Sequence, residues 1–153
     1  MPLATFAAGC FWGIELKLSK LTGVTNTQVG YMGGNTDEPS YQDVCTGLTN
    51  HAEVVQITYD ENLIDYSTLL AAFWAMHDPT TLNRQGPDVG TQYRSAIYFH
   101  TADQQALAQQ SKAEQQNSVF SKPIVTETTA ASTFWTAEVY HQKYLEKRGM
   151  GSC

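Results

Sequence analysis

The spacing of hydrophobic residues changes repeatedly along this chain, and this change restricts its possible folds more than any other feature. Residues 51–59 alternate between two rows, as in a β-strand, whereas residues 67–77 carry their hydrophobic side chains on one face of a helix. Similar patterns predict strands over residues 5–8, 28–31, 95–100 and 124–128, and helices after Gly9, over residues 101–117 and over residues 134–148. Strands and helices alternate irregularly, so we expect an α+β domain around a mixed sheet.

Size and composition favour one globular domain. The chain has 153 residues, of which 42% are hydrophobic and 16% charged. A net charge of -6 with only nine Lys and Arg residues leaves no basic patch for a phosphate backbone, so we expect no nucleic-acid partner. No run approaches the roughly 18 apolar residues of a membrane span, and the N-terminus has no secretory pattern. We therefore expect a cytoplasmic protein that does not associate with membranes.

The three cysteines, Cys10, Cys45 and Cys153, are odd in number and form no CxxC pair, which favours thiols in a reducing compartment. Cys153 lies on a tail rich in glycine, where it could reach Cys10 as a resolving thiol or be idle. Cys45 has no feature of a reactive thiol, and we expect it to be buried.

Cys10 occupies the point at which a strand pattern changes to a helix pattern. A thiolate at the first turn of a helix is stabilised by free backbone N–H groups and by the helix dipole, which lowers the pKa of the thiol. Cys10 is therefore placed to act as a nucleophile. The alternative is that it is a small buried apolar residue, which is common for a free cysteine.

Glu53 heads the more apolar row of the predicted strand over residues 51–59, together with Val55, Ile57 and Tyr59. A carboxyl group facing the core would lose hydration and hold its proton more tightly, so it could donate a proton near neutral pH. The alternative is a carboxylate at the end of a strand that reaches water or a salt bridge.

Other candidates lie in segments rich in turn residues. Tyr41 follows one such segment, and Asp88 and Tyr93 lie in a long stretch, residues 78–93, with little periodicity. A loop of that length is usually functional or disordered, and its side chains can point into a cleft.

The four histidines do not predict a metal site. They are scattered along the chain, without the close pairs of ligands that zinc sites use. We expect each to form structural hydrogen bonds.

Several motifs together resemble one known family. The string GCFWG at residues 9–13 resembles the signature of the A-type peptide methionine-S-sulfoxide reductases. Five further segments resemble the family in the same order: GYMGG at residues 30–34, YQDVCTGLTNHAEVV at 41–55, FWAMHDPT at 73–80, NRQGPDVGTQYRS at 83–95 and AEVYHQKYL at 137–145. The resemblance covers nearly the whole chain.

The resemblance implies a mechanism. Cys10 would attack the sulfur of methionine S-sulfoxide, free or in a protein, while Glu53 delivers a proton to the oxygen and Tyr41 and Tyr93 hydrogen-bond to it. Cys10 would become a sulfenic acid, which Cys153 would convert to a disulfide for reduction by thioredoxin. Such an enzyme repairs oxidative damage.

The resemblance also assigns further features. Phe11 and Trp12 would form an apolar slot for the methyl group, and Asp88 would help to hold a water molecule. The family fold is a two-layer α/β sandwich around a mixed sheet with long coil segments. We expect residues 1–148 to form one catalytic domain, residues 149–153 a mobile tail that carries the resolving cysteine, and the protein to be a monomer that needs no metal or organic cofactor.

Two positions depart from the family pattern. Asn50 stands where glycine is usual, and asparagine tolerates the left-handed conformation that such a turn requires. The tail has one cysteine where some members have two, so a Cys10–Cys153 disulfide would be presented to thioredoxin directly.

Two other functions are compatible with parts of the sequence. A cysteine hydrolase or acyltransferase also begins with a thiolate, but it needs a His base near the thiol. A binding module could use Phe11, Trp12 and the tyrosines as an aromatic groove, although this leaves Cys153 unexplained.

Overall fold

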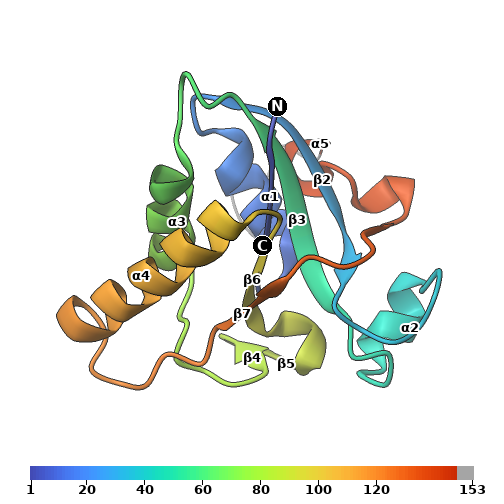
Figure 1. The fold of residues 1–153 in the computed structure, drawn as a ribbon. Coiled ribbons are helices and arrows are strands. Elements are labelled where there is room, and N and C mark those ends of the chain that lie inside the picture. The colour runs from blue at the N-terminus through green and yellow to red at the C-terminus, as the bar shows by residue number, and fades with distance from the viewer. Residues whose placement is uncertain (148–153) are drawn as a thin grey trace.

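A computed structural model describes residues 1–147 of the chain (Figure 1). The strands are β1 Leu3–Ala8, β2 Val24–Met32, β3 Ala52–Tyr59, β4 Arg84–Gln85, β5 Asp88–Val89, β6 Ser95–Phe99, β7 Glu127–Ala130 and β8 Trp135–Thr136. The helices are α1 Phe11–Ser19, α2 Tyr41–Cys45, α3 Tyr66–Ala75, α4 Ala102–Ser118 and α5 Tyr144–Lys147, with 3-10 turns η1 Thr91–Tyr93 and η2 Val139–His141.

Six strands form one sheet in the order β7-β6-β1-β3-β2-β8. Its pairs are antiparallel except for β6 and β7, which are parallel and are joined through α4. The predicted α+β fold with a mixed sheet is therefore confirmed. β4 and β5 form a separate hairpin.

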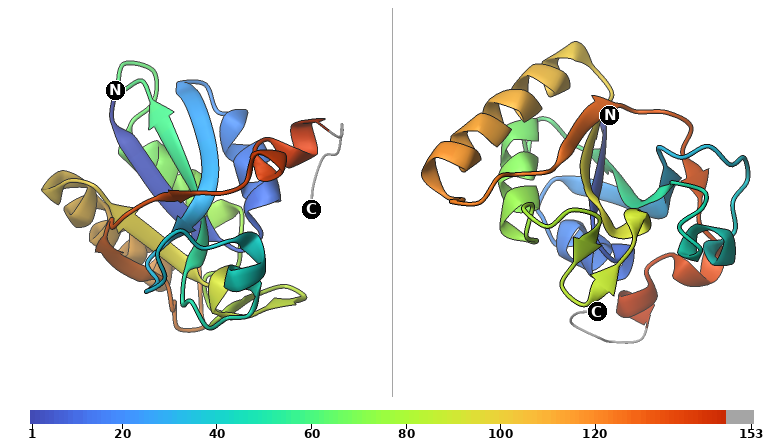
Figure 2. Two further views of the ribbon diagram at one scale, coloured as in Figure 1. Left: turned by 90° about the vertical axis from the view of Figure 1, so that its right-hand side faces the viewer. Right: turned by 90° about the horizontal axis from the view of Figure 1, so that it is seen from below.

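The two rows of β3 face different layers of the molecule. Val55 and Ile57 pack with α1 and α3 in the larger apolar core, and α4 packs on α3 and on the β6–β7 end of the sheet. Val54 faces a smaller core, which Phe134 partly covers as the chain crosses from β7 to β8 (Figures 1 and 2). The row with Val55 is buried along its length, whereas the row with Val54 is buried at its start and partly buried at Gln56 and Thr58.

The predicted helix over residues 134–148 is wrong. The chain there forms β8, η2 and the short α5 instead. This segment pairs with the edge of β2. Ala137 N–H donates to Val29 O at 3.0 Å, and the Gln142 side chain accepts from Val29 N–H and donates to Val29 O. Lys143, with a φ of 55°, then interrupts any helix. Tertiary hydrogen bonds thus override the helical spacing.

The stretch over residues 78–93, expected to be a loop, contains the β4–β5 hairpin and η1. The last predicted strand is displaced, from residues 124–128 to Glu127–Ala130. Asn50 has a φ of 59°, so the prediction of a left-handed turn residue is confirmed. Within residues 1–147, no helix has the length and apolar character to cross a bilayer. The predicted tail over residues 149–153 lies outside the described residues.

Candidate active site

Cys10 lies at the junction between β1 and α1, as the sequence predicts. Gly9 precedes it with a φ of 98°, a left-handed conformation that favours glycine. Cys10 is the N-cap residue of the nine-residue helix α1 and is partly exposed. It therefore lies at the positive end of the helix dipole, where a thiolate is stabilised. The alternative of a fully buried apolar cysteine is wrong.

The β4–β5 hairpin closes against this junction. A Cβ atom at Gly9 would lie 2.8 Å from Cβ and Cγ of Gln85, so the hairpin can approach this closely only because residue 9 is glycine. The Gln85 side chain accepts a hydrogen bond from Asp78 N–H at 2.9 Å and donates one to Asp78 O at 2.8 Å. The poorly periodic stretch is thus an ordered cover beside Cys10.

Glu53 contacts the first turn of α1. It is the second residue of β3, pairs with Tyr31 of β2 and is only 2% exposed. Its Oε1 accepts a hydrogen bond at 3.2 Å from the backbone N–H of Phe11, the residue bonded to Cys10. The prediction that Glu53 faces the core is confirmed, and the alternative of a water-exposed carboxylate is wrong.

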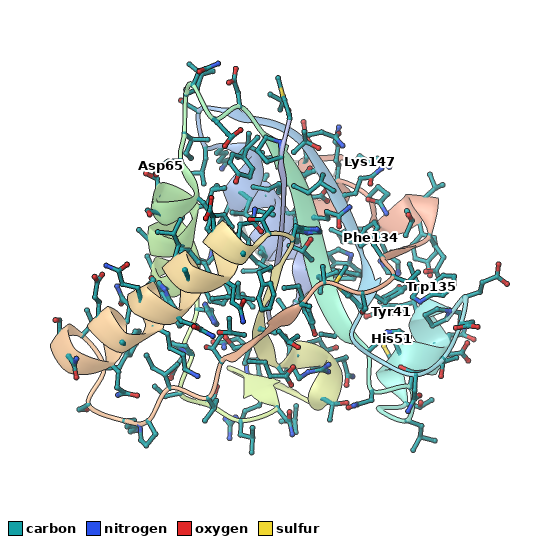
Figure 3. All side chains as sticks on the ribbon, in the orientation of Figure 1. Tyr41, His51, Asp65, Phe134, Trp135 and Lys147 are labelled. Carbon is teal, nitrogen blue, oxygen red and sulfur yellow. The ribbon has the colours of Figure 1, made fainter. Side chains whose placement is uncertain are left out.

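Tyr41 begins α2, where that helix meets the sheet (Figure 3). Ser40 caps the helix, and the Tyr41 ring stacks on Phe11 with a centroid separation of 6.4 Å. Burial raises the pKa of the Tyr41 hydroxyl above its usual value, and the negative charge of Glu53 raises it further. A phenol with a raised pKa stays protonated and can donate a hydrogen bond.

Tyr93 brings the remaining candidates into one cluster. It ends η1, just before β6, and its pKa is raised to about 12, first because burial disfavours the phenolate and then because of the charge of Glu53. Smaller contributions to this shift come from Cys45, Asp88 and Cys10. Glu53, Asp88 and Cys10 are thus near enough to Tyr93 to affect its pKa, and Glu53 and Tyr93 in turn affect the pKa of Tyr41. The fold therefore gathers these five predicted residues at one end of the sheet. Cys153 lies outside the described residues.

The two aromatic residues after Cys10 have different surroundings. Phe11 is 1% exposed and belongs to the core. Trp12 is partly exposed, and its Nε1 donates to His141 Nδ1 at 3.0 Å while its ring stacks on Tyr144 at 3.9 Å. These contacts fix the orientation of the Trp12 ring.

Each histidine makes structural hydrogen bonds, as predicted. His141 accepts from Trp12 Nε1, and Nδ1 of His51 accepts from Gly34 N–H at 3.0 Å. His77 contacts Phe73 O and Ser95 Oγ, each at 2.7 Å, and His100 contacts Thr5 Oγ1 at 2.8 Å. Over residues 1–147, no three His, Cys, Asp or Glu side chains are grouped so as to hold a metal ion.

Comparison with known proteins identifies the family. The family model described as peptide methionine sulfoxide reductase matches residues 3–153. The peptide methionine sulfoxide reductase MsrA of Methanoculleus marisnigri is 57% identical over 151 residues, which cover 98% of this chain and 92% of the relative. The chain belongs to the peptide methionine sulfoxide reductase family. It is an enzyme that reduces methionine sulfoxide, and the alternatives of a cysteine hydrolase and of a binding module are set aside.

Solved structures share the fold of this peptide methionine sulfoxide reductase. Mxr1 from Saccharomyces cerevisiae in reduced form superposes with a TM-score of 0.91 at 38% identity, covering 99% of this chain and 88% of that chain. Mxr1 from the same organism in complex with Trx2 has a TM-score of 0.67 at 26% identity, covering 94% of this chain and 84% of that chain.

Two residues of this peptide methionine sulfoxide reductase lie at the site although no sequence pattern places them there. The Glu138 carboxylate accepts from Tyr31 OH and from Tyr41 N–H, each at 3.0 Å, and so ties the C-terminal segment to the site. His141 is 1% exposed, with its ring 4.3 Å from that of Tyr41. The motif AEVYHQKYL contains both, but the false prediction of a helix gave no reason to bring them to Cys10.

The prediction that Cys45 is buried is wrong. Its side chain is exposed on α2, where only Val44 is buried. The thiol is still partly desolvated by its neighbours, which raises its pKa, whereas a hydrogen bond with Tyr41 lowers the pKa.

Proposed function

We propose that Cys10 is the nucleophile and Glu53 the acid in the reduction of methionine S-sulfoxide, free or in proteins. The Cys10 thiolate attacks the sulfoxide sulfur, Glu53 gives a proton to the oxygen, and the oxygen is transferred to Cys10. The products are methionine and the sulfenic acid of Cys10, so two electrons pass from the thiol to the sulfoxide. The hydrogen bond from Phe11 N–H to Glu53 is the observation that carries this proposal, since it brings the acid next to the nucleophile.

The surrounding residues suit the other parts of this chemistry. Tyr41 and Tyr93 both have raised pKa values, so their hydroxyl groups remain donors for the sulfoxide oxygen at neutral pH. Trp12 is partly exposed and fixed by its contacts with His141 and Tyr144, which suits it to hold the methyl group, with Phe11 packed behind the site. Asp88, in β5, would help to hold a water molecule.

For recycling, we propose that Cys153 attacks the sulfenic acid of Cys10, which gives a disulfide and water. A thioredoxin-type dithiol then reduces the disulfide. The complex of the related Mxr1 with Trx2 supports this partner. In this proposal residues 1–148 are one catalytic domain, residues 149–153 carry the resolving thiol, and the enzyme acts as a cytoplasmic monomer that repairs oxidised proteins without a metal or organic cofactor.

Three variants test the roles. N-acetylmethionine S-sulfoxide is the substrate and dithiothreitol the reductant, which makes the assay independent of Cys153. Cys10→Ser should abolish methionine formation, and Glu53→Gln should lower the rate about 10²–10⁴-fold, because it removes the acid but keeps the side-chain shape. Cys45→Ser is the matched control, a thiol near the site that should be dispensable. Turnover by Cys10→Ser would overturn the nucleophile assignment.

A further inference from the structure

Four large apolar side chains are exposed on segments next to the active site. We name them the apolar rim: Leu48 is 84% exposed, Val89 70%, Val139 80% and Tyr140 58%. Single exposed apolar residues are normal on a protein surface, but several together indicate a site of interaction.

The contacts of the segments that carry the rim place these segments next to α2 and the loop that follows it. The α2 loop and the segment after β5 are joined where Thr91 Oγ1 donates to Gly47 O at 3.4 Å. Leu48 directly follows Gly47, and Val89 precedes Thr91 by two residues. These two rim residues therefore flank the same contact.

Tyr140, on the C-terminal segment, packs against residues that contact α2. Its ring centroid is 4.1 Å from that of His141, and its hydroxyl lies 3.5 Å from Glu138 Oε2. The Glu138 carboxylate accepts from Tyr41 N–H at 3.0 Å and the His141 ring lies 4.3 Å from that of Tyr41, so η2 lies beside α2. In the left view of Figure 2, α2 lies between the hairpin and the C-terminal segment.

A substrate in a polypeptide must touch this rim. The reacting sulfur has to reach Cys10, and an extended chain advances only about 3.3–3.6 Å per residue. The residues one or two positions from the methionine sulfoxide therefore remain about 4–7 Å along the chain from it, at the mouth of the site. Free methionine sulfoxide has no such neighbours.

We propose that the apolar rim binds apolar side chains that flank methionine sulfoxide in a polypeptide substrate. The inference rests on the proposed function, in which Cys10 is the nucleophile, and it adds a preference for sequence context. The exposed apolar side chains of the rim favour apolar neighbours, and Asp88 and Glu138, which lie on the same segments, would repel acidic ones.

The test compares three substrates that share the S-sulfoxide group. They are a pentapeptide with leucine on each side of the central methionine sulfoxide, a matched pentapeptide with glycine on each side, and N-acetylmethionine S-sulfoxide. The triple variant Leu48→Ser, Val89→Ser, Val139→Ser should raise KM for the leucine peptide about tenfold or more, since each apolar contact contributes a few-fold. The KM values for the other two substrates should change less than about twofold.

Leu63→Ser and Val119→Ser are the matched controls. These side chains are 62% and 63% exposed, similar to the rim residues. Leu63 follows the far end of β3 and Val119 caps the C-terminus of α4, so neither borders the active site (Figure 1). All three KM values should be unchanged in both variants.

Other outcomes separate the alternatives. Equal loss with all three substrates, or no loss with the leucine peptide, would overturn the inference. If the triple variant raised only the KM for thioredoxin, the rim would bind the reductant and not the substrate. If it only slowed disulfide formation after reaction with the free substrate, the rim would bind residues 148–153 of this chain. If the unchanged enzyme failed to reduce N-acetylmethionine S-sulfoxide, the proposed function itself would fail.

Discussion

Substitution of Glu15 tests how much the hydrogen bonds between α1 and the C-terminal segment contribute to stability. The side chain is 2% exposed on α1, where its Oε2 accepts from Thr27 Oγ1 at 2.8 Å and its Oε1 accepts from Lys143 N–H at 2.6 Å. Glu15→Ala removes both acceptors, and each donor left without one costs about 1–3 kcal/mol. We expect a loss of about 3 kcal/mol in the free energy of unfolding, which lowers Tm by about 6–12 °C.

Glu15→Gln is the matched variant. Its amide oxygen can still accept from Lys143 N–H, and its amide nitrogen can donate to Thr27 Oγ1, so we expect a loss of only about 1 kcal/mol at pH 7. Urea denaturation of the three proteins measures both differences. If Gln destabilised the fold as much as Ala did, the two hydrogen bonds would not be the source of the stability.

The difference in stability between the wild type and Glu15→Gln should depend on pH. Burial raises the pKa of Glu15 above its usual value of 4.5, so the folded state holds this proton to higher pH than the unfolded chain does. The wild type therefore loses stability as the pH rises from about 4.5 through the folded-state pKa, and has the full contribution below that range. Glu15→Gln has no ionisable group here and does not lose stability in this way. The amount by which it is less stable than the wild type should therefore shrink as the pH rises. A stability deficit of Glu15→Gln that grew with pH would show that the pKa of Glu15 is not raised in the folded state.

Three other sets of measurements test local features. Gly9→Ala should cost about 3 kcal/mol in urea denaturation because its Cβ would meet Gln85, whereas Gly86→Ala, with a φ of 56° and no atom within 4 Å of its Cβ, should cost about 1 kcal/mol. Asn50→Ala should cost about 1 kcal/mol and Asn50→Gly almost nothing, because the φ of 59° is left-handed; equal costs would refute this. Burial lowers the pKa of His77 to about 4, so its ring proton shifts in NMR should titrate near pH 4, and stability should fall as the pH drops from 6.5; titration near 6.5 would contradict the burial.

The sequence was most informative where local chemistry and hydrophobic pattern agree. The change from strand to helix after Gly9 located Cys10 at the start of α1, and the alternation in β3 correctly turned Glu53 toward the core. Neither pattern could show that the two residues meet, because that depends on the register between β1 and β3. For Tyr41, Tyr93 and Asp88, the grouping came from family resemblance and not from spacing.

The sequence was least informative where long-range hydrogen bonds decide the backbone. Residues 134–148 have helical spacing, but the edge of β2 binds Ala137 and Gln142. The roles of Glu138 and His141 were missed for the same reason. Cys45 was misjudged because residue type alone favours burial, whereas a helix as short as α2 buries only one of its side chains.

The most direct test of the central claim is intact mass and thiol counting after one equivalent of methionine S-sulfoxide is added to the fully reduced protein without a recycling reductant. The account predicts one methionine per protein, loss of two thiols and about two mass units, and a Cys10–Cys153 peptide after digestion. Release of methionine with a disulfide between Cys10 and Cys45, or with a lasting sulfenic acid, would contradict the recycling step. If methionine were formed while Cys10 remained a thiol, the assignment of Cys10 as the nucleophile would be wrong.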